Sequence, residues 1–266
     1  MPMRYALISD IHGNLPALEA VLEDLDQEVN DRSDPEARAP DAVYHLGDLV
    51  GYAPWPDEVV TLLRERGIAG VAGNYDSTTA TGYEHCGCKY EDPRQEELSH
   101  RSYEWTLAHT SPETKAWLGG LPFRLDLRPQ GGHRSGPRLI LVHGNPILNT
   151  VYWTDDRSDA FCLKMADHLG AGVGDVVAFG HTHKPWHRVV GGVHFVNTGS
   201  VGRPKDGDWR AGYVVVEMGE DDPVVEFHRV EYNVERAATA IRGSQLPDEF
   251  GDFLETGGKL EEGAES

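Results

Sequence analysis

Cysteine is scarce in this sequence. The 266 residues include only Cys86, Cys88 and Cys162, and an odd number this small excludes a disulfide framework for a chain of this length. Cys86 and Cys88 together make half a zinc site, and no second pair completes it. We therefore expect structural or incidental thiols, with a metal or redox role of the pair as the alternative.

Long apolar runs are also missing. No stretch approaches the roughly 18 apolar residues needed to cross a bilayer. Before Ser9 and Asp10 the amino terminus has only the short run 5–8, which lacks the pattern of a secretory signal. The content of 39% hydrophobic and 26% charged residues is typical of a globular protein. We expect a cytoplasmic protein with no membrane association.

Positive charge is the third deficit. Lys and Arg number 24 against 44 Asp and Glu, which gives a formal net charge of −20. A surface this acidic repels phosphate backbones, and we therefore expect no nucleic-acid partner. It would also repel a small phosphorylated substrate unless the binding site has local positive charge, and metal ions are the obvious source of that charge.

Strand-like and helical patterns alternate along the chain, which predicts an α/β fold. The predicted helices cover 15–25, 57–66, 99–109 and 158–169, and the predicted strands cover 5–9, 42–46, 70–72, 139–142, 176–179, 193–196, 213–218 and 224–230. Residues 27–40 read as an exposed loop. Residues 76–98 show no clear period and suggest an insertion or lid. We expect one domain over 1–245 and an acidic tail over 246–266, a weak helix followed by a disordered end.

Five of the strand-like runs end directly before polar, metal-binding side chains. In open α/β sheets, ligands bind at the carboxyl ends of strands, where the loops converge. The five ends therefore predict one shared site. Its candidate ligands are Asp10, His12, Asp48, Asn74, His143, His181 and His183.

The chemistry of these seven side chains suits a pair of metal ions. Imidazole nitrogens combined with carboxylate and amide oxygens fit manganese, iron, zinc or nickel, and the set includes no thiolate. Seven donors exceed what one ion needs, but they suit two ions if one carboxylate bridges them. Each segment alone has an ordinary reading, such as a capped turn or a pair of surface imidazoles. The five segments in this order favour a metal site.

The order Asp10-x-His12, Gly47-Asp48, Gly73-Asn74-x-Asp76, His143-Gly144 and Gly180-His181-x-His183 resembles the calcineurin-like metallophosphoesterases. The resemblance spans residues 5 to about 205 and is closest to the small prokaryotic phosphodiesterase branch. It implies a four-layer α/β/β/α sandwich of two mixed sheets. It also implies two divalent metal ions, with manganese as the first choice. One ion would be held by Asp10, His12, Asp48 and His183, and the other by Asp48, Asn74, His143 and His181.

One residue departs from the family pattern. Family members that cleave poor leaving groups often have a His after Gly-Asn, positioned as a general acid, and this chain has Tyr75 there. An unperturbed Tyr has a pKa of about 10, so it donates a proton reluctantly near neutral pH. We favour packing or stacking for Tyr75, with general-acid catalysis as the alternative.

Substrate contacts are expected outside the ligand set. Arg203 and Lys205 lie in a Gly-rich loop and would suit a phosphate, although a solvated loop is the equal alternative. Asn14 is a second candidate contact and also a plausible helix N-cap. The other histidines, among them His45, are expected to be surface or core residues.

The predicted function is metal-dependent hydrolysis of a small phosphate ester, in which Asp48, Asn74, His143 and Tyr75 serve catalysis. A diester or a dinucleotide polyphosphate fits the resemblance better than a monoester. The alternatives are a non-catalytic scaffold of the same fold, a nuclease and a protein phosphatase. The sequence leaves the oligomeric state open.

Overall fold

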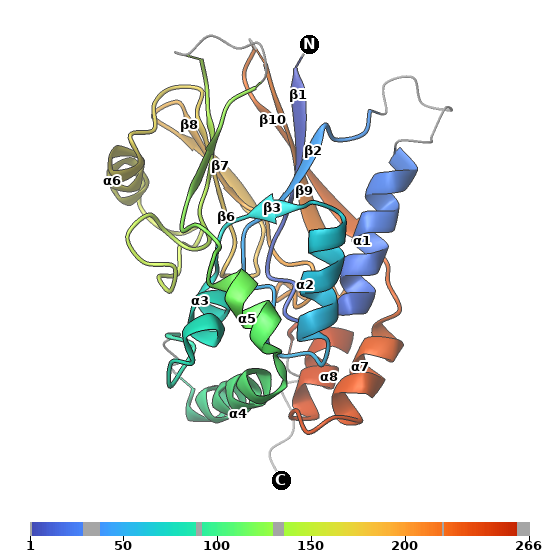
Figure 1. The fold of residues 1–266 in the computed structure, drawn as a ribbon. Helices are drawn as coiled ribbons and strands as arrows, with labels where there is room; N and C mark the ends of the chain where they lie inside the picture. The colour runs from blue at the N-terminus through green and yellow to red at the C-terminus, as the bar shows by residue number, and fades with distance from the viewer. Residues whose placement is uncertain (1, 29–37, 89–91, 130–135, 220, 260–266) are drawn as a thin grey trace.

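The chain folds into a four-layer α/β/β/α sandwich, as expected (Figure 1). The computed structural model describes residues 2–28, 38–88, 92–129, 136–219 and 221–259. Most of the predicted loop 27–40 and the end of the predicted tail lie outside these ranges. Within them, no helix is both long and apolar enough to span a membrane.

The first sheet is mixed. Its strand order is β10 (Val224–Val230), β9 (Ala211–Met218), β1 (Met3–Ile8), β2 (Ala42–His45) and β3 (Ala69–Gly70). The strands β1, β2 and β3 run parallel, and β9 pairs antiparallel with β1 and with β10. The carboxyl ends of β1, β2 and β3 therefore lie at one edge of the sheet.

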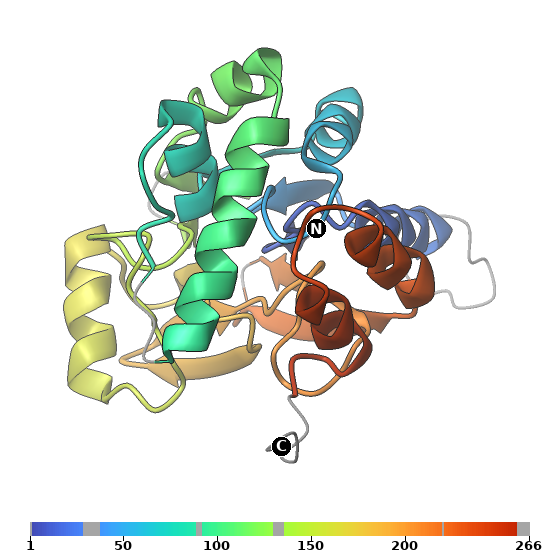
Figure 2. The same cartoon turned by 90° about the horizontal axis from the view of Figure 1, so that it is seen from below.

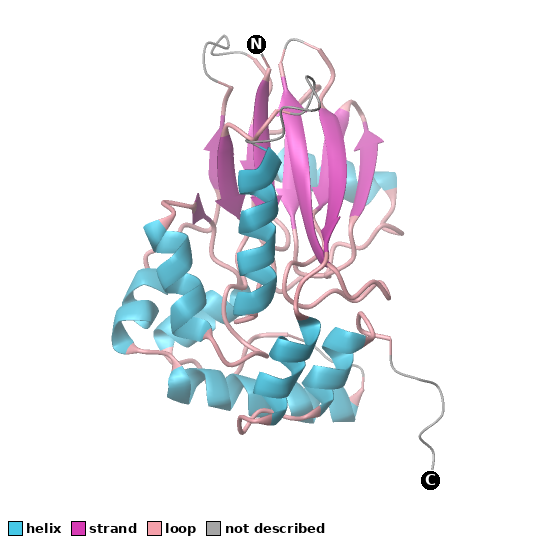
Figure 3. Ribbon diagram, turned by 90° about the vertical axis from the view of Figure 1, so that its right-hand side faces the viewer, coloured by secondary structure: helices cyan, strands magenta, loops and turns pink. Residues whose placement is uncertain are grey.

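The second sheet has the same number of strands. Its order is β4 (Leu125–Leu127), β5 (Leu139–Leu141), β6 (Val176–Phe179), β8 (Val193–Asn197) and β7 (Trp186–Val190). The central strands β5, β6 and β8 are parallel, and β4 and β7 pair antiparallel at the two edges. Seen with α1 in front, most of the helices and loops lie below the strands (Figure 3).

Eight helices are present in the described residues. They are α1 (Leu15–Glu28), α2 (Pro56–Glu65), α3 (Asn74–Thr81), α4 (Pro93–His109), α5 (Pro112–Leu118), α6 (Asp159–Leu169), α7 (Val234–Arg242) and α8 (Glu249–Glu255). Helices α1 and α2 flank the first sheet and α6 covers the second (Figure 1). From below, α4, α7 and α8 lie across the end of the sandwich (Figure 2).

Three apolar cores hold the layers together. Alternate residues of β1 point to opposite faces of its sheet, so Leu7 packs between the sheets while Ile8 packs against the helices. The core under α6 is built around Trp153, which stacks on Phe179 with ring centroids 4.4 Å apart. Fully burying a side chain of this size contributes about 1.5–3 kcal/mol.

The segment 76–98 is more ordered than its sequence suggested. Helix α3 occupies its beginning and α4 its end, and whether it acts as a lid stays a prediction. The expected start of α4 at Ser99 is wrong, because the helix begins at Pro93 with Asp92 as its cap. The Asp92 side chain accepts a hydrogen bond from the Arg94 N–H at 2.9 Å, and proline at the first helical position fits this start.

The predicted tail also belongs partly to the domain. A helix was expected after residue 246, and α8 confirms it. However, Leu246, Phe250 and Leu254 are at most 3% exposed and join the core under the first sheet. The domain therefore continues past residue 245, because this short helix buries its apolar face against α7.

Candidate metal centre

All seven candidate ligands lie at the carboxyl ends of parallel strands. Asp10 and His12 follow β1, and Asp48 follows β2. Asn74 opens α3 just after β3, His143 follows β5, and the pair 181 and 183 follows β6. None of the seven residues is more than 3% exposed. The structure thus brings together the residues that the sequence singled out.

The backbone at this site is strained. Asp10, His12, Asp48, His181 and His183 have φ values between 51° and 66°, in the left-handed region that non-glycine residues rarely adopt. Such strain persists only where surrounding structure enforces it, and it gathers at functional sites. The turns let the side chains of one short loop reach a common point.

Glycines beside the ligands allow close approach. A Cβ at Gly73 would lie 2.1 Å from Asp48 Oδ1, and one at Gly180 would lie 2.3 Å from Asp10 Oδ2. Both distances are impossible contacts, so only glycine fits these two positions.

Asp10, His12 and His183 form the first triad. The Nε2 atoms of its two histidines are 3.1 Å apart, and Asp10 Oδ1 lies 3.2 Å from His183 Nε2. His12 Nδ1 lies 3.1 Å from the Val50 carbonyl, and His183 Nδ1 lies 2.6 Å from the Arg203 carbonyl. Since a carbonyl only accepts, each Nδ1 carries the proton and each Nε2 presents a lone pair.

Asp48, His143 and His181 form the second triad, and Asn74 lies beside it. His143 Nε2 is 3.2 Å from both His181 Nδ1 and Asn74 Oδ1, and 3.4 Å from Asp48 Oδ2. His143 Nδ1 donates to the Leu46 carbonyl at 2.8 Å, which again turns Nε2 toward the centre.

Asp48 lies between the two triads. Its Oδ2 is 3.8 Å from His12 Nε2 and 3.4 Å from His143 Nε2, while its Oδ1 accepts the Tyr75 N–H at 2.9 Å. This is the position that a bridging carboxylate requires.

The donors fit cations. The facing Nε2 lone pairs of His12 and His183 repel each other at 3.1 Å unless positive charge lies between them. Asp10 Oδ1 and His181 Nε2 are buried without a hydrogen-bond partner among the described residues. Each triad offers ligand atoms that all lie within 4.8 Å of one another. Nitrogen and oxygen donors in this mixture suit first-row divalent metals.

Protonation differs between the histidines. Burial lowers the pKa of His12 to about 3 and that of His181 to about 4, so both imidazoles are neutral, as metal ligands must be. Burial alone would also lower the pKa of His143, but the Asp48 carboxylate outweighs it and raises that pKa to about 9. In turn, His143 holds the pKa of Asp48 well below its usual range, against the effect of burial.

Three residues around the ligands were missed as functional candidates. Asp76 accepts backbone N–H groups of Asp48 (2.8 Å), Leu49 (2.9 Å) and Gly73 (2.9 Å), so it fixes the loop that carries the bridging carboxylate. Burial and the nearby Asp48 raise the pKa of Asp76 to about 7. The signal was present in the sequence, since Asp76 belongs to the Gly-Asn-x-Asp motif.

The other two are Cys86 and Cys88. The Asn74 Nδ2 group donates to the Cys86 carbonyl at 3.0 Å and to Cys88 Sγ at 3.2 Å. Both contacts direct Asn74 Oδ1 toward His143. Nothing in the sequence indicated that these cysteines would meet Asn74, because the contact depends on the path of the loop after α3.

Tyr75 lies inside an aromatic cluster. It is 1% exposed, and its ring is 5.5 Å from the His12 ring, 5.0 Å from Tyr52 and 5.8 Å from Tyr103. A Cβ at Gly51 would lie 2.6 Å from the Tyr75 ring, so the two are in close contact. This surrounding agrees with the packing role favoured for Tyr75.

Asn14 and Arg203 have different surroundings. Asn14 Oδ1 accepts the Ala17 N–H at 3.3 Å, and its Nδ2 donates to the Gly202 carbonyl at 2.8 Å and to the Tyr232 hydroxyl at 3.3 Å. The amide is thus occupied within the protein, where it caps α1, and the substrate contact at Asn14 stays a prediction. Arg203 is only 4% exposed.

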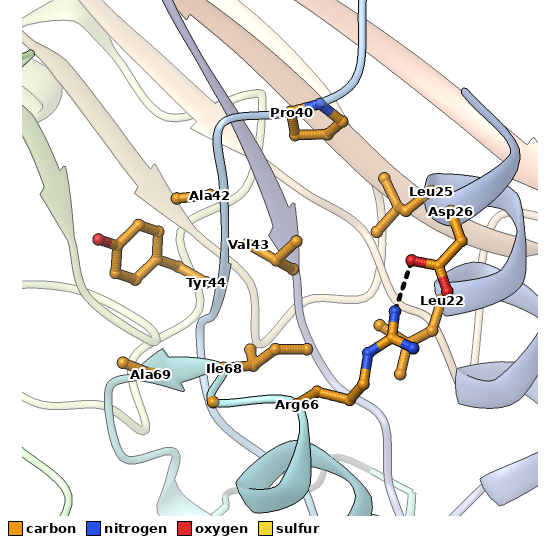
Figure 4. A pocket seen from close by; sticks show the side chains of 11 residues that line it. Leu22, Leu25, Asp26, Pro40, Ala42, Val43, Tyr44, Arg66, Ile68 and Ala69 are labelled. Carbon is orange, nitrogen blue, oxygen red and sulfur yellow. Dashed lines mark hydrogen bonds and ion pairs between the residues drawn. The ribbon is translucent and has the colours of Figure 1, made fainter. Parts of the chain in front are cut away.

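Two of the hollows in the described part of the chain lie outside the ligand cluster. One, of about 360 Å³, lies between α1 and the strands β2 and β3, and the Arg66–Asp26 ion pair lies beside it (Figure 4). The other, of about 640 Å³, is lined by Cys86 and Cys88 together with Glu84, Glu96 and Glu97. Its three carboxylates make it unfavourable for a phosphate group.

The family model described as "Calcineurin-like phosphoesterase superfamily domain" matches residues 3–221. The chain is 29% identical to uncharacterized protein MJ0912 of Methanocaldococcus jannaschii over 94% of this chain and 96% of that protein.

Two solved structures are also similar. A metallophosphoesterase from Sphaerobacter thermophilus is 28% identical, with a TM-score of 0.70 over 97% of this chain and 100% of that one. Hypothetical protein PH1004 from Pyrococcus horikoshii OT3 is 22% identical, with a TM-score of 0.79 over the same shares, and this likeness concerns the fold alone.

Proposed function

Because the chain belongs to the calcineurin-like phosphoesterase superfamily, we propose that the seven buried ligands form a two-metal site that hydrolyses small phosphate esters. The observation that supports this most is the pair of Nε2 lone pairs of His12 and His183, which face each other at 3.1 Å. Only a cation between them removes their repulsion.

In this proposal Asp10, His12 and His183 hold one divalent ion, and Asn74, His143 and His181 hold the other. Asp48 contacts both. Manganese is our first choice, with iron, zinc and nickel also suited to the donors. When bound, two such ions neutralise charge on the phosphoryl oxygens and acidify a water molecule.

The protein's own groups keep this arrangement fixed. Backbone carbonyls of Leu46, Val50 and Arg203 set three imidazole orientations, and such supporting contacts are typically worth 10–100-fold in metal affinity or activity. Tyr75 contributes its backbone N–H to Asp48 and its ring to the wall beside His12. The leaving oxygen would then depart without protonation by this side chain.

We propose a phosphodiester or a dinucleotide polyphosphate as the substrate, acted on in the cytoplasm. A net charge of −20 makes a nucleic acid an unfavourable partner. A non-catalytic scaffold has no physical need of seven convergent donors. A protein phosphatase would need a surface that reads a peptide, and neither hollow described above offers one of suitable charge beside the ligands.

The test is a hydrolysis screen on chelator-treated protein to which manganese is restored. Mono-, di- and polyphosphate esters would be compared, and metal content measured in parallel. We expect two ions per chain and metal-dependent turnover, both lost in Asp48→Asn. Asp167→Asn is the matched control, since Asp167 is an exposed residue of α6 on the far side of the second sheet.

The screen also separates the rival functions. Two bound ions without hydrolysis of any ester would favour a scaffold. Turnover restricted to phosphopeptides would favour a protein phosphatase. Wild-type protein that binds fewer than two ions under saturating manganese would refute the two-metal site.

A further inference from the structure

Arg203 is a buried cation without a counter-charge. Its side chain forms no ion pair with any carboxylate in the described part of the chain, and its Nε–H has no hydrogen-bond partner there. Arg138, a partly buried arginine, differs from Arg203 because its guanidinium lies 2.7 Å from Asp175. A guanidinium this deeply buried is expected to be paired, because removing an unpaired charge from water is costly.

Three aromatic rings surround the guanidinium. Its Cζ lies 4.0 Å from the centroid of Tyr52, 5.0 Å from Phe253 and 5.3 Å from Phe250. Cation–π contacts of this kind offset part of the desolvation cost and fix the group in place. They do not satisfy its N–H donors, which need an oxygen acceptor.

Two rings of this cage come from outside the matched family domain. Phe250 and Phe253 belong to α8, whereas the family model ends at residue 221. Helix α8 therefore supplies two of the three aromatic rings around the Arg203 guanidinium. The view from below shows α7 and α8 closing this end of the molecule (Figure 2).

The Arg203 guanidinium lies on the side of the first triad. The Arg203 carbonyl accepts the Nδ1–H of His183, and the Tyr52 ring under the guanidinium meets the His12 ring edge-on at 4.9 Å. The guanidinium is near enough to help lower the pKa of both imidazoles, after burial. Lys205 follows two residues later, its N–H 3.3 Å from the His183 carbonyl. Its ammonium also has no carboxylate within 4.0 Å among the described residues.

We propose that Arg203, assisted by Lys205, binds a phosphate group of the substrate other than the one that reacts. This deepens the proposed function, on which it rests, and it favours nucleotide esters with two or more phosphates over simple diesters. A non-reacting phosphate provides the oxygen acceptors that the guanidinium lacks, in charge-assisted hydrogen bonds. A purely structural Arg203 would make no distinction between the two substrate classes.

The experiment compares two esters with the same leaving group. One is the 4-nitrophenyl ester of thymidine 5′-monophosphate, and the other is the γ-(4-nitrophenyl) ester of thymidine 5′-triphosphate. Nitrophenolate release is followed for manganese-loaded wild type, Arg203→Met and Lys205→Met. We expect wild-type kcat/KM to be about 10–100-fold higher for the triphosphate ester, the range of one or two charge-assisted hydrogen bonds.

In Arg203→Met this preference should fall to about threefold or less, mainly through KM, because a non-reacting phosphate contributes uniform binding. Lys205→Met should lose a smaller part of the preference. Both variants should lose much less turnover of the monophosphate ester than of the triphosphate ester, and both should keep two ions per chain. The matched controls are Arg236→Met, which removes an exposed arginine paired with Glu19, and Lys164→Met on α6.

A second variant tests the same preference without removing Arg203, in case Arg203→Met misfolds. Phe253→Leu keeps an apolar side chain but opens the cage, and it should reduce the same preference while Arg203 remains present. Thermal unfolding would be recorded for every variant. Equal losses on both esters, or an unchanged preference in Arg203→Met, would overturn the proposal.

Binding without catalysis separates the two proposals. Inorganic tripolyphosphate is titrated into chelator-treated wild type and Arg203→Met. Binding by wild type alone would support the anion site even if no ester is hydrolysed, an outcome that refutes only the proposed function. Hydrolysis without any preference for the triphosphate ester, and equal tripolyphosphate binding, would refute only the anion site.

Discussion

The two triads have the same composition, one Asp and two His, but the Asp and one His of each differ in the direction of their pKa shifts. In the first triad, burial lowers the pKa of both imidazoles and raises that of Asp10. In the second, Asp48 and His143 stabilise each other's charged forms, so the pKa of Asp48 falls and that of His143 rises. Composition alone does not set the protonation of a ligand set.

The difference comes from the neighbours of each triad. The first lies beside the cations Arg203 and Lys205, which both lower the pKa of His183 after burial. The second has His143 within 3.4 Å of Asp48 and no comparable cation among the largest influences on that histidine. A metal ion would therefore meet neutral imidazoles in one triad and compete with a proton in the other.

The largest effect is expected when the carboxylate of Asp48, which lies between the two triads, is removed. Asp48→Ala removes the carboxylate that lies near both, so we expect both ions to be lost and turnover to fall by about 10³-fold or more. Asp10→Ala should release mainly the first ion, and Arg203→Ala should have only a mild effect on simple diesters. Metal content and turnover are measured together. Equal, mild losses in Asp48→Ala and Arg203→Ala would show that the bridge is misassigned.

The next effect concerns pH. Because His143 titrates near 9 in the metal-free protein, a cation must displace its proton at neutral pH. Affinity at the second triad should therefore rise by about tenfold per unit from pH 7 toward 9. Affinity at the first triad should change much less, because His12 has already lost its proton above about pH 3.

Calorimetric manganese titrations at pH 7, 8 and 9, in buffers of different ionisation enthalpy, measure both affinities and the protons released. About one proton should be released at the second site at pH 7. Two sites with the same pH slope would contradict the assigned asymmetry.

A smaller effect should be confined to the second triad. Cys88→Ala removes one of the two contacts that orient the Asn74 amide, so the weaker of the two metal affinities should fall by about tenfold. The first site should be unaffected. Cys162→Ala is the control, a buried thiol of α6 far from Asn74. Losses shared by both sites, or seen equally in the control, would mean that the cysteine is merely structural.

The smallest effect is expected at Tyr75. Tyr75→Phe should leave turnover of aryl diesters nearly unchanged, because the hydroxyl is not asked to donate a proton there. Wild-type rates should fall steeply as leaving-group pKa rises, and Tyr75→His should recover part of the roughly 10²–10⁴-fold that a general acid provides. Turnover against leaving-group pKa is measured for all three proteins. A shallow wild-type slope that becomes steep in Tyr75→Phe would identify Tyr75 as a working acid.

The sequence was most informative where local chemistry repeats a simple pattern. The predicted strands 176–179 and 224–230 match β6 and β10 residue for residue, and the predicted helix 158–169 matches α6 with Ser158 as its cap. The seven ligands were found because parallel strands place their carboxyl ends at one edge. Periodicity and topology are both visible in a sequence.

The remainder depends on contacts between distant segments. Helix α3 has little apolar periodicity, and it was missed because Asp76 and Asn74 hold its first turn through hydrogen bonds to other loops. The sequence predicted only a weak helix for α8, because the helix is stabilised by packing on Tyr52 and Arg203, which are far away in sequence. The charge of His143 could not be foreseen, since it depends on one distance to Asp48.

The left-handed ligands bear on how such a site is maintained by selection. Five non-glycine residues held at φ between 51° and 66° cost of order 1 kcal/mol or more each, and a whole domain is typically stable by about 5–15 kcal/mol. Glycine at these positions would relax the backbone and delete a ligand. A glycine variant at any of these positions should therefore gain folding stability and lose metal affinity, so the Asp and His present there exchange folding stability for chemistry.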